Sequence, residues 1–133
     1  MFDIEICEER KVGLVRFHGE LTEADFDALD AAARAVKDGP AYDVIYDMSG
    51  IDHAHLAIDF VSKRGALPQA NPGKQRLYVV PQHDLKLLVR LYAAYQVSKG
   101  WQPPAVVDTL QDALDRLQIA RSDFKPYPSP RPA

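Results

Sequence analysis

Cysteine is almost absent from this chain of 133 residues, since Cys7 is its single cysteine and no disulfide can form within the chain. With its apolar neighbours, Cys7 is typical of a small buried core residue, and a reducing compartment fits this cysteine usage. The sequence also lacks a run of about 18 apolar residues and a basic start followed by an apolar segment, which argues against a membrane span and a signal peptide. We therefore expect a cytoplasmic protein without integral membrane association.

Positive charge is not in excess either. The formal net charge is -3 and charged residues make up 26% of the chain, so nothing attracts nucleic acid or anionic lipid to the molecule as a whole. A Gly-rich phosphate loop and a nucleophile-elbow motif are both missing. These absences predict no nucleic-acid partner, no cofactor and no recognisable catalytic residue.

What is present is a regular alternation of apolar segments that predicts one α/β domain, and 133 residues suffice for one core that buries roughly two thirds of the unfolded surface. Period-2 patterns and short apolar runs indicate strands at 2–7, 12–18, 42–46, 76–80 and 104–108. Patterns with spacings of three and four indicate helices between a Thr22 cap and Gly39-Pro40, and at about 54–64, 84–99 and 110–117. The order β-β-α-β-α-β-α-β-α, with the first two strands antiparallel and right-handed crossovers, predicts a mixed sheet of about five strands with about four helices. Whether the helices cover one face of the sheet or both is left open.

The last part of the chain has a different composition. Prolines at 126, 128, 130 and 132 and the lack of an apolar pattern from Ser122 onward are typical of an extended or disordered segment. We therefore predict a domain at 1–120 and a Pro-rich tail at 121–133 that lies outside the core.

The stretch Tyr42 to Asp52, YDVIYDMSGID, is where we expect the functional edge. Val44 and Ile45 lie in a strand, which we expect to end in a loop at Asp47. Ligands bind beyond the carboxyl ends of the strands in open α/β sheets, and the loop after the next strand opens at the same edge if the two strands are parallel neighbours. The candidate ligand- or partner-binding residues are Asp47, Ser49, Asp52, His53, His55, Gln82, His83 and Asp84.

Three function classes compete for these residues. A metal-dependent enzyme or small hydrolase would use the histidines and nearby acids, for example with Ser49 as nucleophile and His83 as base. Against it, Asp47 and Ser49 are common turn residues that bond to nearby backbone amides, His53 and His55 fit the start of the second helix, and Asp84 fits the N-cap of the third. A homodimeric component is another alternative, in which Tyr92, Tyr95 and Trp101 would line a pocket or a dimer surface instead of the core. We favour a non-enzymatic binding module without a functional metal.

Three segments together resemble STAS domains, the modules named from sulfate transporters and anti-sigma-factor antagonists. The features that this chain shares with STAS domains are a Gly-x-Leu before the first helix, an apolar strand that runs into Asp-x-Ser-Gly-φ-Asp, and a closing strand with a short helix. The middle of the chain, RLYVVPQHDLKLLVRLYAAYQVSKGW, is similar to the SpoIIAA-like (STAS/SEC14-like) branch. The segments are GLVRFHGELTEADFDAL, YDVIYDMSGID and PAVVDTLQDALDRL.

The chain departs from the antagonists at one motif. Their Asp-Ser-Ser-Gly, which opens the second helix and carries the phosphorylated serine, corresponds here to His55-Leu56-Ala57-Ile58, where no hydroxyl can accept a phosphate. The resemblance therefore implies a STAS-like fold and a regulatory module that binds a partner protein or a small, lipid-like or anionic ligand. It does not imply partner switching by phosphorylation.

Overall fold

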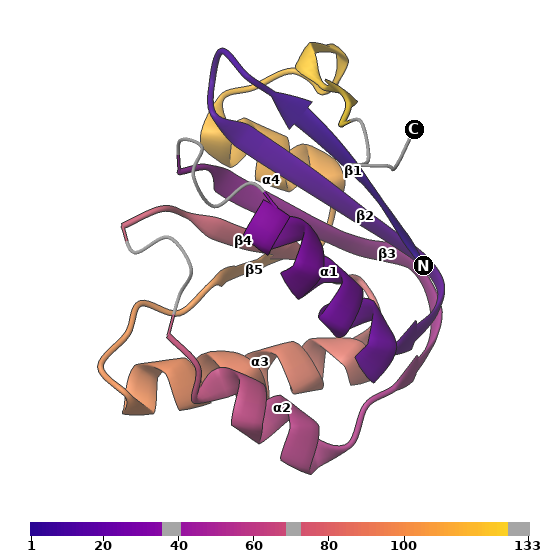
Figure 1. Ribbon diagram of the computed structural model, residues 1–133, viewed down its shortest axis with the longest axis vertical. Helices are drawn as coiled ribbons and strands as arrows, with labels where there is room; N and C mark the ends of the chain where they lie inside the picture. The colour runs from indigo at the N-terminus through magenta and orange to yellow at the C-terminus, as the bar shows by residue number, and fades with distance from the viewer. Residues whose placement is uncertain (36–40, 69–72, 128–133) are drawn as a thin grey trace.

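The computed structural model describes residues 1–35, 41–68 and 73–127. These residues form an α/β arrangement of one sheet with helices packed on it (Figure 1). In chain order the elements are β1 (Phe2–Cys7), β2 (Val12–Thr22), α1 (Glu23–Ala35), β3 (Asp43–His55), α2 (Ile58–Gly65), β4 (Arg76–Val79), α3 (His83–Ser98), β5 (Ala105–Val107), α4 (Leu110–Leu117), the 3-10 helix η1 (Arg121–Asp123) and β6 (Lys125–Pro126).

The strands lie in the order β5-β4-β3-β2-β1-β6 in a single mixed sheet. β1 pairs antiparallel with β2, and β3 lies parallel to both β2 and β4. This arrangement confirms the predicted α/β fold class, the antiparallel first pair and the parallel neighbours β3 and β4. The sheet has one more strand than the five expected, because β6 pairs antiparallel with β1.

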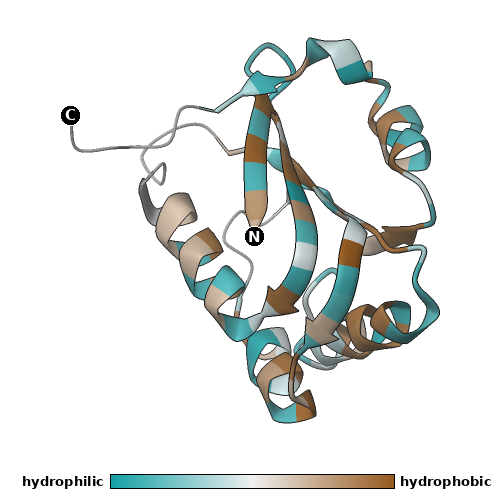
Figure 2. Ribbon diagram, turned by 90° about the vertical axis from the view of Figure 1, so that its right-hand side faces the viewer, coloured by the Kyte–Doolittle hydropathy of each residue, from teal (hydrophilic) through white to brown (hydrophobic). Residues whose placement is uncertain are grey.

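Helices cover both faces of the sheet, which answers the question left open by the sequence. Successive side chains of a strand point to opposite faces of the sheet, so Ile45 and Leu77 pack on the α4 side while Tyr46 and Tyr78 pack on the side of α1, α2 and α3. Figure 2 shows the sheet between α1 on one side and α4 on the other. In the described part of the chain, no helix is long and apolar enough to cross a bilayer.

The loop predicted from Asp47 onward is wrong, because β3 continues as a strand to His55. The partner that sustains it is β2, which also runs further than expected, through Gly19 to Thr22. The pairing shifts register between Arg16 and His18 and again between Gly19 and Glu20, as β-bulges do. Gly50 belongs to this irregular stretch, since a Cβ there would lie 2.8 Å from the Phe17 carbonyl oxygen. The second helix consequently starts only at Ile58.

Within the C-terminal segment that we predicted to lie outside the core, Phe124 is an exception. Phe124 is buried in the same cluster as Leu14 and Leu117, and β6 extends the sheet. The Arg121 guanidinium makes a two-pronged ion pair with the Glu5 carboxylate, at 2.8 and 2.9 Å. Proline does not prevent this pairing because β6 lies at the sheet edge, where a missing N–H is tolerated. Residues 128–133 of the predicted tail lie outside the described residues.

The structure agrees with some of the helix caps and buried helix faces predicted from the sequence, and differs from others. The Thr-x-x-Asp spacing at Thr109 and Asp112 predicts the N-cap of α4, and the Thr109 hydroxyl does accept from the Asp112 amide. Asp84 is not the cap of α3, because Gln82 holds that position and α3 begins at His83. The buried face of α3 contains Leu85, Val89 and Gln96. The spacings of three and four in the sequence predict another inner stripe, whose residues are half-buried in the structure: Leu88, Leu91, Tyr92 and Tyr95.

Candidate functional site

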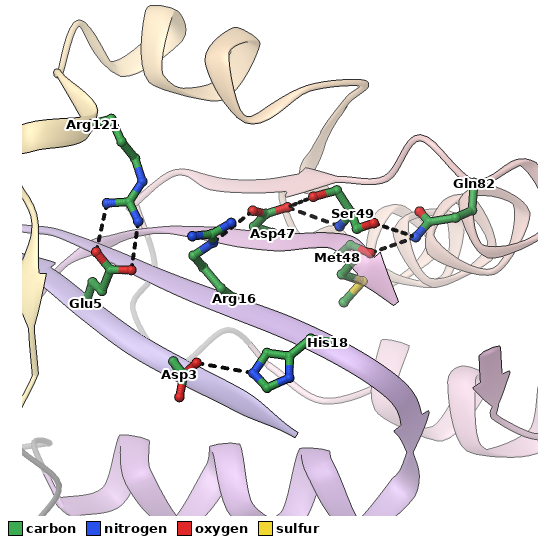
Figure 3. A network of polar contacts seen from close by, with 9 residues as sticks. All are labelled: Asp3, Glu5, Arg16, His18, Asp47, Met48, Ser49, Gln82 and Arg121. Atoms are coloured by element: carbon green, nitrogen blue, oxygen red, sulfur yellow. Dashed lines mark hydrogen bonds and ion pairs between the residues drawn. The ribbon is translucent and has the colours of Figure 1, made fainter. Parts of the chain in front are cut away.

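Asp47 is the centre of a polar network on the α4 side of the sheet (Figure 3). It is a buried carboxylate, 2% exposed, and accepts hydrogen bonds from the Ser49 amide at 3.0 Å and the Ser49 hydroxyl at 2.6 Å. The Arg16 Nε lies 3.3 Å from its other oxygen. Opposite charge and hydrogen bonds together compensate the loss of water around a buried carboxylate. Asp47 thus bonds to a nearby backbone amide, as the alternative from the sequence expected, but it does so within β3 and not in a turn, and the Ser49 hydroxyl bonds to the Asp47 carboxylate instead of to a backbone amide.

Gln82 closes the open edge of β3. β4 pairs with β3 only as far as Asp47, so the carbonyl groups of β3 beyond that point have no β4 partner. The Gln82 side-chain amide donates to the Met48 carbonyl at 2.8 Å and to the Ile51 carbonyl at 2.9 Å. The structure thus brings Gln82 to the backbone around Ser49, as Figure 3 shows, and gives it a role in holding β3 in place.

The other five candidate residues are exposed and lie at the carboxyl end of the parallel strands. His53 and His55 lie at the end of β3, with ring centroids 6.4 Å apart. The His55 Nε2 lies 3.6 Å from a Glu20 carboxylate oxygen. They neither start nor cap α2, contrary to the alternative weighed from the sequence. We call the following set the strand-end surface: Asp52, His53, His55, Ile58, His83 and Asp84.

The enzyme alternatives gain no support from these positions. The Ser49 hydroxyl donates to Asp47, not to an imidazole, and the His83 side chain makes no hydrogen bond or ion pair within the described residues. Among those same residues, no group of three His, Cys, Asp or Glu side chains is arranged to hold a metal. A nucleophile needs a base within hydrogen-bond reach, and this pair does not provide one.

Sequence reasoning missed five members of the network. Arg16 and Asp3 are cross-strand neighbours on the same face of the sheet, and the Asp3 carboxylate lies 3.2 Å from the His18 Nε2. The signal for Arg16 is its place between Val15 and Phe17, because one polar residue between two buried ones must project to the opposite face of the sheet. Glu5 and Arg121 form the remaining pair.

The face with α1, α2 and α3 holds an apolar cavity of about 40 Å³. Tyr78 and Tyr92 line it, and Arg64 reaches over the Phe26 ring at 4.6 Å to a bidentate ion pair with Asp30. Its lining residues are Leu21, Phe26, Met48, Leu56, Phe60, Val61, Arg64, Tyr78, Leu85, Leu88, Val89 and Tyr92. A space of this size holds a few water-sized molecules.

Burial controls the ionisation of the tyrosines in this layer. It raises the pKa of Tyr46 to about 12, with a further contribution from Tyr92, and it raises the pKa of Tyr78 well above its ordinary value. The two rings stack with centroids 4.7 Å apart. For Arg64, burial alone would lower the pKa, but the hydrogen bonds and charge of Asp30 outweigh it and raise the pKa. These groups therefore keep fixed protonation states at neutral pH.

No family model matches the chain, and no curated protein matches it in sequence. Solved structures match in shape. The anti-sigma factor antagonist SpoIIAA in its unphosphorylated form has a TM-score of 0.60 at 16% identity, covering 89% of this chain and 98% of that one. The fold is SpoIIAA-like. An uncharacterized DUF3478-family protein with a SpoIIAA-like fold, from Shewanella loihica PV-4, has a TM-score of 0.52 at 17% identity, covering 88% and 92%. At these identities the likeness concerns the SpoIIAA-like fold alone, and it confirms the fold expected from the STAS resemblance.

The start of α2 lacks the chemistry expected of a phosphorylated antagonist. Its N-cap is Ala57, which has no side-chain group to bond the first helical amides, and Leu56 and Ile58 flank it. The SpoIIAA-like fold is thus present here with an apolar entry to α2 in place of hydroxyl groups.

Proposed function

We propose that this chain is a non-enzymatic binding and regulatory module that binds a partner protein through the strand-end surface. The observation that carries the proposal is Ile58, the first residue of α2, which is 63% exposed and lies three positions after the exposed His55 that ends β3. Large apolar side chains surrounded by polar ones are a common composition of protein-binding surfaces.

Charge and rigidity support the same surface. It presents His53, His55 and His83 with the carboxylates of Asp52 and Asp84, so it offers donors and acceptors around an apolar centre. Gln82 fixes the β3 backbone next to it, and a preordered surface loses less entropy when it binds. A protein partner fits this surface better than a small ligand, because none of its residues lines the cavity of about 40 Å³.

The test compares two matched substitutions in affinity purification from the source cells with quantitative mass spectrometry. Ile58→Asp places a charge at the centre of the strand-end surface, whereas Leu67→Asp changes a similarly exposed apolar residue beyond the other end of α2. We expect at least one protein to be enriched by the wild type and by Leu67→Asp and to be lost with Ile58→Asp. Enrichment that survives Ile58→Asp, or no specific enrichment at all, would reject the proposal.

A further inference from the structure

α2 and α3 lie side by side and end at the same end of the molecule, on the left in Figure 1. The buried Gln96 of α3 joins the two helix ends. Its side-chain amide donates to the Leu67 carbonyl at 3.0 Å, and its backbone carbonyl accepts from the Trp101 amide at 3.0 Å. The Arg76 guanidinium donates to the Gln102 carbonyl at 2.6 Å, so the start of β4 belongs to this end as well.

Cationic side chains gather at this end. Lys63 lies in the last turn of α2, Lys99 directly follows α3, and Lys74 lies two residues before the start of β4. Together with Arg76, they make no ion pair with any carboxylate in the described part of the chain. A helix dipole favours cations near the C-terminal end of a helix, so the position of the lysines alone does not indicate a ligand.

Two apolar side chains at the same end are not explained by the helix dipole. Leu67 follows Lys63 by four residues and is 55% exposed, and Trp101, the single tryptophan of the chain, is half-buried. Large apolar side chains among lysines suit the interface of a lipid bilayer. There the apolar groups enter the headgroup layer, and the ammonium groups contact anionic headgroups. We call the following set the basic tip: Lys63, Leu67, Lys74, Arg76, Lys99 and Trp101.

Carboxylates lie at the other end of the same two helices. Asp59 and Asp84 are in the first turns of α2 and α3, Asp52 lies near the end of β3, and all three are exposed. The formal net charge of the chain is -3, so the basic tip is positive only because these charges are separated. An anionic bilayer attracts the tip and repels the other end, which orients the molecule with the strand-end surface away from the lipid.

We infer that the basic tip docks on the surface of a lipid bilayer that contains anionic lipids. This inference goes beyond the proposed function, because the tip lies at the opposite end of α2 and α3 from the strand-end surface and leaves that surface open to a protein. Nucleic acid also carries negative charge, but it offers no apolar layer for Leu67.

Vesicle sedimentation with purified protein tests the inference. The wild type should bind vesicles of phosphatidylcholine and phosphatidylserine in equal amounts, and should not bind vesicles of phosphatidylcholine alone. Raising the salt from about 0.1 M to about 1 M should release it, because the Debye length falls from about 10 Å to about 3 Å. Brominated acyl chains in the phosphatidylserine vesicles should quench the fluorescence of Trp101, which reports its contact with the bilayer.

Substitutions identify the surface that binds. Lys63→Glu and Lys99→Glu should each bind the phosphatidylserine vesicles about tenfold more weakly than the wild type, because each removes an attractive charge and adds a repulsive one. Arg90→Glu is the control, since it makes the same change in net charge at an exposed position in the middle of α3. It should bind like the wild type. Leu67→Asp should also bind about tenfold more weakly, whereas Ile58→Asp, at the other end of α2, should not differ from the wild type.

A wild type that binds neither kind of vesicle, or that binds both equally, would overturn the inference. Lysine variants that bind like Arg90→Glu, or Trp101 fluorescence that the brominated lipids do not quench, would overturn it as well. Binding of single-stranded DNA instead of vesicles would reject the bilayer and assign the basic tip to nucleic acid. Circular dichroism confirms that each variant is folded, and Leu67→Asp gives an independent reading if a charge variant does not fold.

Discussion

Asp47 combines deep burial with a partner that is itself half-exposed. Its carboxylate accepts from Ser49 twice, and the Arg16 side chain that neutralises it is 44% exposed. Asp47→Asn keeps the shape but removes the charge, and we expect it to lower the free energy of unfolding by about 1–3 kcal/mol. The exposed Arg16 can regain water, so the loss should stay below that for breaking a fully buried ion pair.

Urea titration of Asp47→Asn against Asp52→Asn measures this effect. Asp52 is an exposed acid five residues further along β3, and its substitution should change stability by less than about 0.5 kcal/mol. Equal stability of the two variants would contradict a structural role for the Asp47 charge.

Tyr46 gives the molecule a pH dependence at the alkaline end. Burial raises the pKa of its phenol from 10.0 to about 12, so as the pH rises through that window the unfolded chain releases its proton first. Its contribution to stability is full below pH 10 and is lost toward pH 12. We expect Tyr46→Phe to keep more of its neutral-pH melting temperature at about pH 11 than the wild type does. Tyr42→Phe is the control, and a pH profile for Tyr46→Phe that matches it would refute the assignment.

Among the elements, α2 and α3 are held together by a close backbone approach. A Cβ built on Gly65 would lie 2.5 Å from the Tyr95 Cβ, and the fully buried Gln96 side chain donates to the Gly65 carbonyl at 2.5 Å and the Leu67 carbonyl at 3.0 Å. Gly65→Ala raises the helix propensity of α2, but the added Cβ must push the two helices apart. We expect the free energy of unfolding to fall by about 1–3 kcal/mol in total. Ser62→Ala, three residues earlier, carries the propensity gain without the clash. Thermal unfolding of both variants measures the two changes in stability. A Gly65→Ala variant that is more stable than the wild type would contradict a close contact between α2 and α3 at Gly65.

α3 and α4 show how far periodicity predicts the buried face of a helix. In α4 the spacing of Ala113, Leu114 and Leu117 predicts that they lie on the inner face, and they are buried, because one face alone is apolar there. α3 has apolar residues all round, so spacing could not choose between its faces, and the expected inner stripe was displaced by about one residue. Gln96 could not be predicted as a core residue, since its burial depends on the carbonyl groups that α2 presents to it.

The candidate site was predictable in its location and less so in its contacts. The apolar run at Val44 and Ile45 identified the central strand correctly, and the parallel neighbours β3 and β4 bring Gln82 to the backbone near Ser49. Asp47 was identified from the sequence, but Arg16 lies 31 positions earlier and meets it only through the register of β2 and β3. Local patterns do not contain that register, and they do not show that β2 sustains β3 beyond Asp47.

At the scale of the whole molecule, the chain is closed by residues that composition placed in a tail. Phe124 is 7% exposed and packs in the cluster beneath α4, the Tyr127 amide donates to the Ile4 carbonyl at 2.9 Å, and Arg10 donates to the last carbonyl groups of α4. The core cluster on the α4 side is thus closed by contacts between the first ten residues and the C-terminal part of the described chain. The proline content of that part could not predict this, because its place in the core depends on one large apolar side chain, that of Phe124.

Phe124→Ala tests whether that closure contributes to stability. Removing a buried phenylalanine ring leaves a cavity, and we expect the free energy of unfolding to fall by about 3–5 kcal/mol. Lys125→Ala, at the next and exposed position, should change it by less than about 0.5 kcal/mol. Urea unfolding followed by tryptophan fluorescence and circular dichroism reports both variants, and coincident transitions establish two-state behaviour. If Phe124→Ala costs less than about 1 kcal/mol, the segment after Ala120 is peripheral and the stable domain ends where the sequence first predicted. A loss near the upper value instead makes η1 and β6 part of the cooperative unit, so that the strand-end surface and the C-terminal segment unfold together.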